Sequence, residues 1–142
     1  MQLNHINILT TDVARSVAFY EKLFGARKIF EFHENKVVCI INGFEFFIQK
    51  VDEVIYPEHF HLGIRTDHSK LDTLYQVARD LKVPFIKGSN PEPDVFEYDE
   101  YRTAFYLTDP DGLEIEVYTP DKFVLDDEQE QAHTCSSLCV NG

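Results

Sequence analysis

The sequence lacks long apolar runs, an excess of basic residues and a paired set of cysteines. No apolar stretch approaches the roughly 20 residues that a bilayer requires, so we expect no membrane-spanning segment. The 13 Lys and Arg are outnumbered by 25 Asp and Glu. The formal charge of −12, with no basic stripe to offset it, argues against binding to nucleic acid. Three cysteines, an odd number, do not suggest a disulfide framework.

Several functional motifs are missing as well. The N-terminus has no basic segment followed by an apolar one, so no secretory signal is expected, and the cytoplasm is the expected compartment. The sequence has no phosphate-binding loop or dinucleotide fingerprint, and no serine or cysteine nucleophile paired with a base is evident. A chain of 142 residues is long enough for one domain, which should bury roughly 70% of its unfolded surface.

The sequence does contain an internal repeat in the order of its predicted helices and strands. The spacing of apolar residues predicts strand–helix–strand–strand–strand in residues 1–52 and the same order again in residues 57–119. The first helix follows Asp12 and ends at Gly25, and the second follows Asp67. Strands are predicted at residues 3–9, 26–32, 37–41, 44–49, 60–65, 83–86, 103–108 and 113–118. The last two are joined by the turn Asp109-Pro110-Asp111-Gly112.

These elements predict an α+β fold, with one domain over residues 1–120 made of two tandem βαβββ modules. If both mixed sheets curl with the helices outside, their other faces line one open, barrel-like cavity. Residues 88–102 are acidic and contain two prolines, so we expect a loop there. Residues 121–142 form a polar tail that should be poorly ordered or only loosely docked. Its His133, Cys135 and Cys139 lack the fourth ligand of a soft-metal site.

The two modules can be aligned strand by strand, although their sequence identity is weak. His5 and His61 occupy equivalent places in the first strand of each module. The last strands align Glu45 with Glu114, Phe47 with Glu116 and Gln49 with Tyr118. Because side chains alternate along a strand, each of these pairs should share a face of its sheet.

Potential metal ligands lie on the polar faces of these strands: His5, His59, His61, Glu114 and Glu116. Two imidazoles and one carboxylate are a common site for a first-row metal, with positions left for water or substrate. A single histidine on a strand is more often a solvated or hydrogen-bonded side chain. Spacing alone therefore leaves both interpretations open.

The segments 3–25, His61–Ile64 and Tyr106–Glu116 resemble the vicinal oxygen chelate superfamily. That superfamily includes glyoxalase I, fosfomycin-modifying thiol transferases, extradiol dioxygenases and bleomycin-binding proteins. The resemblance covers residues 3–118, and its most specific part is the Asp-Pro-Asp-Gly turn followed by a glutamate. It implies that His5, His61 and Glu116 bind a divalent ion such as Mn, Fe, Zn, Ni or Co.

One departure from the family pattern narrows the expected chemistry. Members that resemble glyoxalase I have a fourth protein ligand on the last strand of the first module, where this chain has Phe47. A phenylalanine cannot bind a metal, so the resemblance points to the three-ligand branch. Tyr106 falls where fosfomycin-modifying relatives have a substrate-contacting tyrosine, and it is the candidate catalytic residue. A tyrosine packed in the barrel is the alternative.

The resulting hypothesis is a small metal-dependent enzyme whose substrate offers two neighbouring oxygens to the ion. Lyase or isomerase, dioxygenase and thiol-transferase chemistry all remain open. The acidic loop disfavours a dianionic substrate such as fosfomycin. Arg65, Lys87 and Arg102 are the available cations, each a surface residue or a substrate contact. The expected substrate-lining residues are Asn7, Glu45, Phe47, Gln49, Arg65, Arg102 and Tyr118.

Two further expectations come from the resemblance. Relatives of this length form homodimers that share the site, so His5 of one chain should meet His61 and Glu116 of the partner subunit. The alternative function is a metal-free binding protein of the bleomycin-resistance type, because a charge of −12 favours the capture of cations. A third reading is a domain that keeps a metal for structure and has no catalysis.

Overall fold

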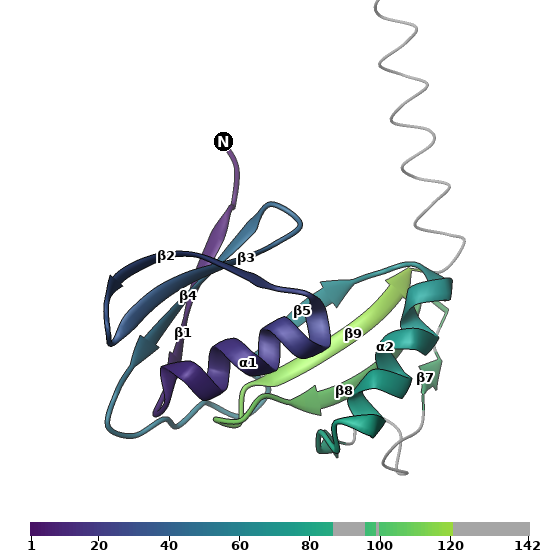
Figure 1. The fold of residues 1–142 in the computed structure, drawn as a ribbon. Helices are drawn as coiled ribbons and strands as arrows, with labels where there is room; N and C mark the ends of the chain where they lie inside the picture. The colour runs from purple at the N-terminus through teal and green to yellow at the C-terminus, as the bar shows by residue number, and fades with distance from the viewer. Residues whose placement is uncertain (87–95, 99, 121–142) are drawn as a thin grey trace, which may run out of the picture.

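The structure is a computed structural model that describes residues 1–86, 96–98 and 100–120. It consists of two modules that lie side by side, each with one helix and one sheet (Figure 1). This arrangement confirms the predicted α+β fold with two separate mixed sheets. Lys87, the predicted tail 121–142 and the cysteines of that tail lie outside the described residues.

The first module contains a four-stranded sheet with the strand order β1-β4-β3-β2. Its elements are β1 (His5–Thr10), α1 (Val13–Phe24), β2 (Arg27–His33), β3 (Lys36–Ile41) and β4 (Phe44–Lys50). The Asp12 carboxylate accepts a hydrogen bond from the backbone N–H of Arg15 and so caps α1. The helix ends at Gly25, whose φ of 68° lies in the left-handed region that glycine tolerates best. Both predicted helix ends are therefore confirmed.

The second module repeats this strand order, as β5-β9-β8-β6. Its elements are β5 (His61–Arg65), α2 (His68–Asp80), β6 (Phe85–Ile86), β7 (Glu97–Tyr98), β8 (Arg102–Thr108) and β9 (Glu114–Pro120). The prediction of a loop over residues 88–102 was wrong at its C-terminal end. There, β7 adds a short fifth strand that pairs with β8, and Arg102 already belongs to β8.

Both helices cover the same side of the two sheets, and the opposite faces of the sheets are left uncovered (Figure 1). Alternation puts one apolar set of side chains beneath the helices, so the core runs through both modules. Its largest fully buried members are Ile8, Tyr20, Ile48, Phe105, Leu107, Leu113, Ile115 and Val117. The side chains of the uncovered faces are therefore not required for this core.

The predicted turn between β8 and β9 forms hydrogen bonds with the first module. The Tyr20 hydroxyl of α1 donates a 2.9 Å hydrogen bond to the buried carboxylate of Asp109. The carboxylate of Asp111 accepts hydrogen bonds from Thr10, Thr11 and Arg15, at the junction of β1 and α1. Burial raises the pKa of Asp109, while the hydrogen bonds that it accepts oppose this shift.

Among the described residues, no helix is both long and apolar enough to cross a membrane.

Candidate metal centre

The strand registers confirm the alignment of the two modules. In the parallel pair β1 and β4, Glu45 lies opposite His5, and Phe47 lies opposite Asn7. In the parallel pair β5 and β9, Glu114 lies opposite His61, and Glu116 lies opposite Gly63. Phe47 and Glu116 therefore occupy equivalent positions on equivalent strands. Phe47, and not Glu45 or Gln49, is thus the residue of β4 that corresponds to Glu116.

Two of the three expected ligands meet on the uncovered face of the second sheet. Nε2 of His61 lies 3.3 Å from Oε2 of Glu116. Nδ1 of His61 is 3.1 Å from the backbone carbonyl oxygen of His59, and a carbonyl can only accept a hydrogen bond. Nδ1 can make this hydrogen bond only as the donor, and in that tautomer Nε2 is the ring nitrogen on the Glu116 side that is available to an ion. This arrangement is typical of metal-binding histidines.

The side chain of His59 takes no part in this contact. His59 precedes β5 and has a φ of 66°, and its side chain is 90% exposed and faces Glu58. It contributes its backbone carbonyl, which orients His61. The sequence prediction had placed His59 on the same strand face as His61, and this was wrong because the strand begins only at His61.

Arg102 is the first residue of β8, and its side chain reaches Glu116. Its Nε donates to Oε1 of Glu116, and its terminal nitrogen donates to the Tyr106 hydroxyl. The same nitrogen lies 3.5 Å from Oε1 of Glu97. Glu97, Tyr106 and Glu116 are each less than 10% exposed. Arg102 itself is partly buried, with 28% of its side chain exposed, and it contacts the expected ligand Glu116.

Of the residues that contact Arg102, Tyr106 was predicted from the sequence and Glu97 was not. Tyr106 lies on β8 directly opposite Glu116, which agrees with its predicted place in the site. Burial raises the pKa of Tyr106, although the hydrogen bond from Arg102 opposes this shift, so the phenol keeps its proton at neutral pH. Glu97 was missed, because its segment was assigned to a loop and the register of β7 cannot be read from composition.

His5 lies on the uncovered face of the first sheet, in different surroundings. Its ring stacks on Phe47, with a centroid distance of 4.8 Å, and its Nδ1 lies 2.9 Å from the Asn4 side-chain oxygen. Phe32 meets Phe47 edge-on, and the Lys36 ammonium lies over both phenyl rings. On the same sheet, Asn7 donates a 3.3 Å hydrogen bond to Gln49. The expected ligand of the first module thus stands beside aromatic side chains.

One chain does not bring all three expected ligands together. Among the described residues, no group of three or more His, Cys, Asp or Glu side chains is close enough to hold an ion. His61 and Glu116 form one pair, and His5 lies apart on the other sheet. Within one chain, the expected ligands are therefore divided between the two sheets.

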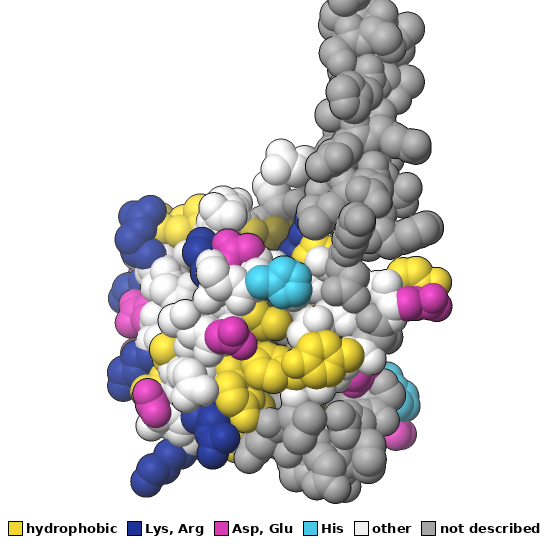
Figure 2. All heavy atoms as spheres, turned by 90° about the vertical axis from the view of Figure 1, so that its right-hand side faces the viewer, with side chains coloured by type: hydrophobic (Ala, Val, Ile, Leu, Met, Phe, Trp, Pro, Cys, Tyr) yellow, Lys and Arg dark blue, Asp and Glu magenta, His cyan; other side chains and the backbone are white. Residues whose placement is uncertain are grey.

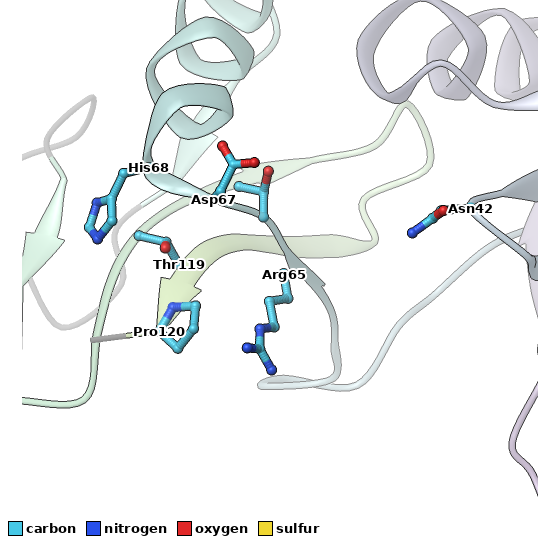
Figure 3. Close-up of a pocket in the computed structure, with 7 residues that line it drawn as sticks. Asn42, Arg65, Asp67, His68, Thr119 and Pro120 are labelled. Atoms are coloured by element: carbon cyan, nitrogen blue, oxygen red, sulfur yellow. The ribbon is translucent and has the colours of Figure 1, made fainter. Parts of the chain in front are cut away.

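Two expected substrate contacts, Arg65 and Tyr118, lie further along β5 and β9 than His61 and Glu116. They face each other across β5 and β9, and the Tyr118 ring lies beside Gly63. Arg65 also lines an open groove of about 530 Å³ at the end of these strands. Figure 3 shows Arg65 on one side of this groove and Asn42 on the other, with Thr119 and Pro120 near Arg65. The groove lies at the strand ends and is lined by none of the expected metal ligands.

The charges on the molecule are unevenly distributed. On the face shown in Figure 2, Lys and Arg side chains gather along the left edge, the side on which the helices lie in Figure 1. Acidic side chains lie between these basic ones and also further to the right, where histidine and hydrophobic side chains are seen. This view therefore shows no basic stripe extending away from the helix side.

The fold agrees with the comparison to known proteins. The model of the glyoxalase/bleomycin resistance protein/dioxygenase superfamily matches residues 2–117, and the chain belongs to this superfamily. The solved structure of the fosfomycin resistance protein FosX from Listeria monocytogenes has the same fold. Its TM-score is 0.72 at 18% identity, over 85% of this chain and 92% of that chain.

Two curated relatives carry enzyme names. The chain is 24% identical over 121 residues to the metallothiol transferase FosB of Lysinibacillus sphaericus, which covers 82% of this chain and 81% of the relative. It is 27% identical over 141 residues to the probable trivalent organoarsenical cleaving enzyme of Bacillus subtilis, over 99% and 92% of the two chains. The superfamily expected from the sequence motifs is thus confirmed.

Proposed function

We propose that this protein is a metal-dependent enzyme that binds one divalent ion through His5, His61 and Glu116. Its substrate is a small molecule with two neighbouring oxygens. The observation that carries the proposal is the 3.3 Å approach of His61 Nε2 to Glu116 Oε2, with Nδ1 held by the His59 carbonyl. A ring nitrogen with a free lone pair and a carboxylate are the ligands that Mn, Fe, Zn, Ni and Co share. The name of the FosB relative, a metallothiol transferase, supports a metal site.

The site is completed between two chains in this proposal. His5 of one chain joins His61 and Glu116 of the partner subunit in a homodimer with two identical sites. The separation of the ligands within one chain supports this arrangement. Phe30 and Phe32 of β2 are 55% and 52% exposed, and a second copy of the chain would remove this apolar surface from water.

The residues around the ion have distinct tasks. A bound divalent ion supplies a Lewis acid that stabilises negative charge developing on a substrate oxygen. The protonated Tyr106 hydroxyl, buried beside Glu116, offers a hydrogen bond to such an oxygen. Phe47 leaves a coordination position open and presents an apolar wall on the His5 side. Thiol transfer and cleavage of an organoarsenical are chemistries named for two relatives, and both use small-molecule substrates.

One observation favours a second candidate function. The Arg102 guanidinium already pairs with Glu116, so this carboxylate is neutralised in the structure without an ion. Together with a formal charge of −12, this is compatible with a metal-free protein that binds cationic compounds, as in the bleomycin-resistance type.

Metal analysis separates the two functions. The protein is purified, stripped with chelator and dialysed against Mn²⁺ or Zn²⁺, and the metal is then counted per chain. The enzyme proposal expects about one ion per chain in the parent and almost none in His61→Ala. His59→Ala is the matched control and should bind like the parent. Folded parent protein that retains no ion would refute the enzyme and favour the binding protein.

A further inference from the structure

We infer that Arg102 is a positioning residue that makes Glu116 a one-oxygen ligand and so keeps coordination positions open for substrate. This inference rests on the proposed metal site and deepens it. It starts from the two oxygens of the Glu116 carboxylate, which have different partners. Oε1 accepts from Nε of Arg102, whereas Oε2 faces Nε2 of His61. Only one oxygen therefore points at the other candidate ligand.

The distance between these candidate ligand atoms fits an ion between them. Two ligands that each lie about 2.1 Å from one ion stand about 3.0–3.5 Å apart when the angle between them is about 90–110°. The separation of Nε2 and Oε2 is 3.3 Å. An ion can thus be held between His61 and Oε2 without disturbing the hydrogen bond between Arg102 and Oε1.

The guanidinium is itself held in one orientation. Its terminal nitrogen donates to Tyr106, four residues along the same strand, and lies 3.5 Å from Glu97 of the neighbouring β7. These contacts fix the plane of the guanidinium group. They therefore also determine which oxygen of Glu116 remains available to an ion. Glu97 also offsets the positive charge of Arg102, which would otherwise repel a nearby cation.

The equivalent positions of the first module show that the fold does not require this network. Phe47 occupies the place of Glu116, and Val38 occupies the place of Tyr106, because Val38 pairs with Phe47 as Tyr106 pairs with Glu116. The same four-strand arrangement forms there with apolar side chains at these two positions. Arg102, Tyr106 and Glu116 are therefore better explained by the site than by the packing of the sheet.

The number of water molecules on a bound Mn²⁺ ion tests this inference. Three one-oxygen or one-nitrogen protein ligands leave about three of six octahedral positions to water. In Arg102→Gln, Glu116 is released to bind through both oxygens. The paramagnetic relaxation of bulk water by the protein–Mn²⁺ complex should then fall by about a third, since one of three waters is lost.

Two further variants separate geometry from charge. Arg102→Lys keeps the charge but cannot bond to Glu116 and Tyr106 with one rigid plane, so it should resemble Arg102→Gln. Arg79→Gln is the matched control, because Arg79 also donates to a tyrosine four residues away, on the exposed side of α2. It should keep the parent's relaxation. Circular dichroism verifies that each variant is folded.

Each outcome bears on a different claim. Bound Mn²⁺ with equal relaxation in the parent, Arg102→Gln and Arg102→Lys would overturn the role of Arg102 and leave the metal site intact. Parent-like relaxation in Arg102→Lys alone would also overturn it, because charge and not orientation would then be the cause. Folded parent protein without Mn²⁺ would overturn the metal site and this inference together.

Discussion

The uncovered faces of the two sheets have the same strand register and opposite chemistry. On the first sheet, His5 stacks on Phe47, and Phe32 and Lys36 continue the aromatic surface. On the second sheet, the positions around Glu116 hold a hydrogen-bonded network with Arg102 and Tyr106. One module thus presents an apolar wall with a histidine, and the other presents a carboxylate with its supporting groups.

This difference shows where a duplicated module is free to diverge. The helix-facing side chains of both sheets remain apolar because they form the common core. Substitutions on the other face change no core contact, so they can create a ligand in one copy and remove it from the other. The predictions below test this comparison, beginning with the largest expected effect.

The equivalent substitutions Glu116→Ala and Phe47→Ala should have unequal effects on metal binding. The first removes a proposed ligand and should abolish stoichiometric binding of Mn²⁺ or Zn²⁺. The second removes a side chain that cannot bind a metal, so the ion content should stay near that of the parent. Equilibrium dialysis with metal counting measures both. Equal losses in the two variants would mean that the faces do not differ as proposed.

Mixing two variants that have each lost metal binding should restore part of it. His5→Ala and Glu116→Ala are unfolded together and refolded. Random pairing makes about half of the dimers mixed, and each of these has one intact site of two, so about a quarter of the parent's sites should return. Metal counting on the refolded mixture is the measurement. Mixed dimers that recover no sites would show that the three ligands come from one chain.

Phe47→Glu should make the first module resemble the second at the equivalent position. A new carboxylate beside His5 adds a fourth ligand, and we expect metal binding to tighten by about 10-fold, or about 1.4 kcal/mol. Turnover should fall, because an open coordination position is filled. Phe47→Leu changes the same side chain without adding a ligand and is the control. Competition with a chelator dye measures affinity, and equal affinities in both variants would refute the equivalence of Phe47 and Glu116.

The turns that join the last two strands of each module also differ, and this predicts a smaller effect on stability. Asp109 accepts from Tyr20, whereas the Asn42-Gly43 turn of the first module has no such buried acid. Tyr20→Phe leaves the Asp109 oxygen unpaired and should lower the free energy of unfolding by about 1–3 kcal/mol at pH 7. Denaturant titration measures this change, and Tyr98→Phe, at an exposed tyrosine, should change it little.

The pH dependence of this loss has a defined sign. Burial raises the pKa of Asp109, and the Tyr20 hydrogen bond opposes that shift because it stabilises the ionised carboxylate. Removing the hydroxyl therefore raises the pKa of Asp109 further. The stability lost in Tyr20→Phe should be largest where Asp109 is ionised, and should shrink as the pH falls through its pKa. An equal loss at pH 7 and pH 3.5 would contradict this account.

Local sequence patterns predicted much of the fold. Helix caps at Asp12, Gly25 and Asp67 and the turn at residues 109–112 depend on interactions within a few residues, and each is found as expected. The alignment of Phe47 with Glu116 followed from the strict alternation of strand side chains, and the registers confirm it. The resemblance then identified His61 and Glu116, which do lie together.

The supporting residues could not be predicted in the same way. Arg102 and Glu97 meet because β7 pairs with β8, and this pairing depends on tertiary contacts that an acidic, proline-containing segment does not reveal. His59 contributes through its backbone carbonyl, which leaves no mark on the side-chain pattern. The groove that Arg65 and Asn42 line from opposite sides joins residues of the two modules, and no local sequence pattern predicts it.

The link between the β8–β9 turn and the start of α1 has a consequence for how the chain opens in solution. A chain made of two copies could lose one copy while the other stays folded. Here Asp109 and Asp111 of one copy satisfy hydrogen-bond donors of the other, including Tyr20 and Thr10. Unfolding either module alone would leave these groups without their hydrogen-bond partners. We therefore expect the slowest-exchanging amides of β1 and β9 to exchange with solvent deuterium together, as one cooperative unit.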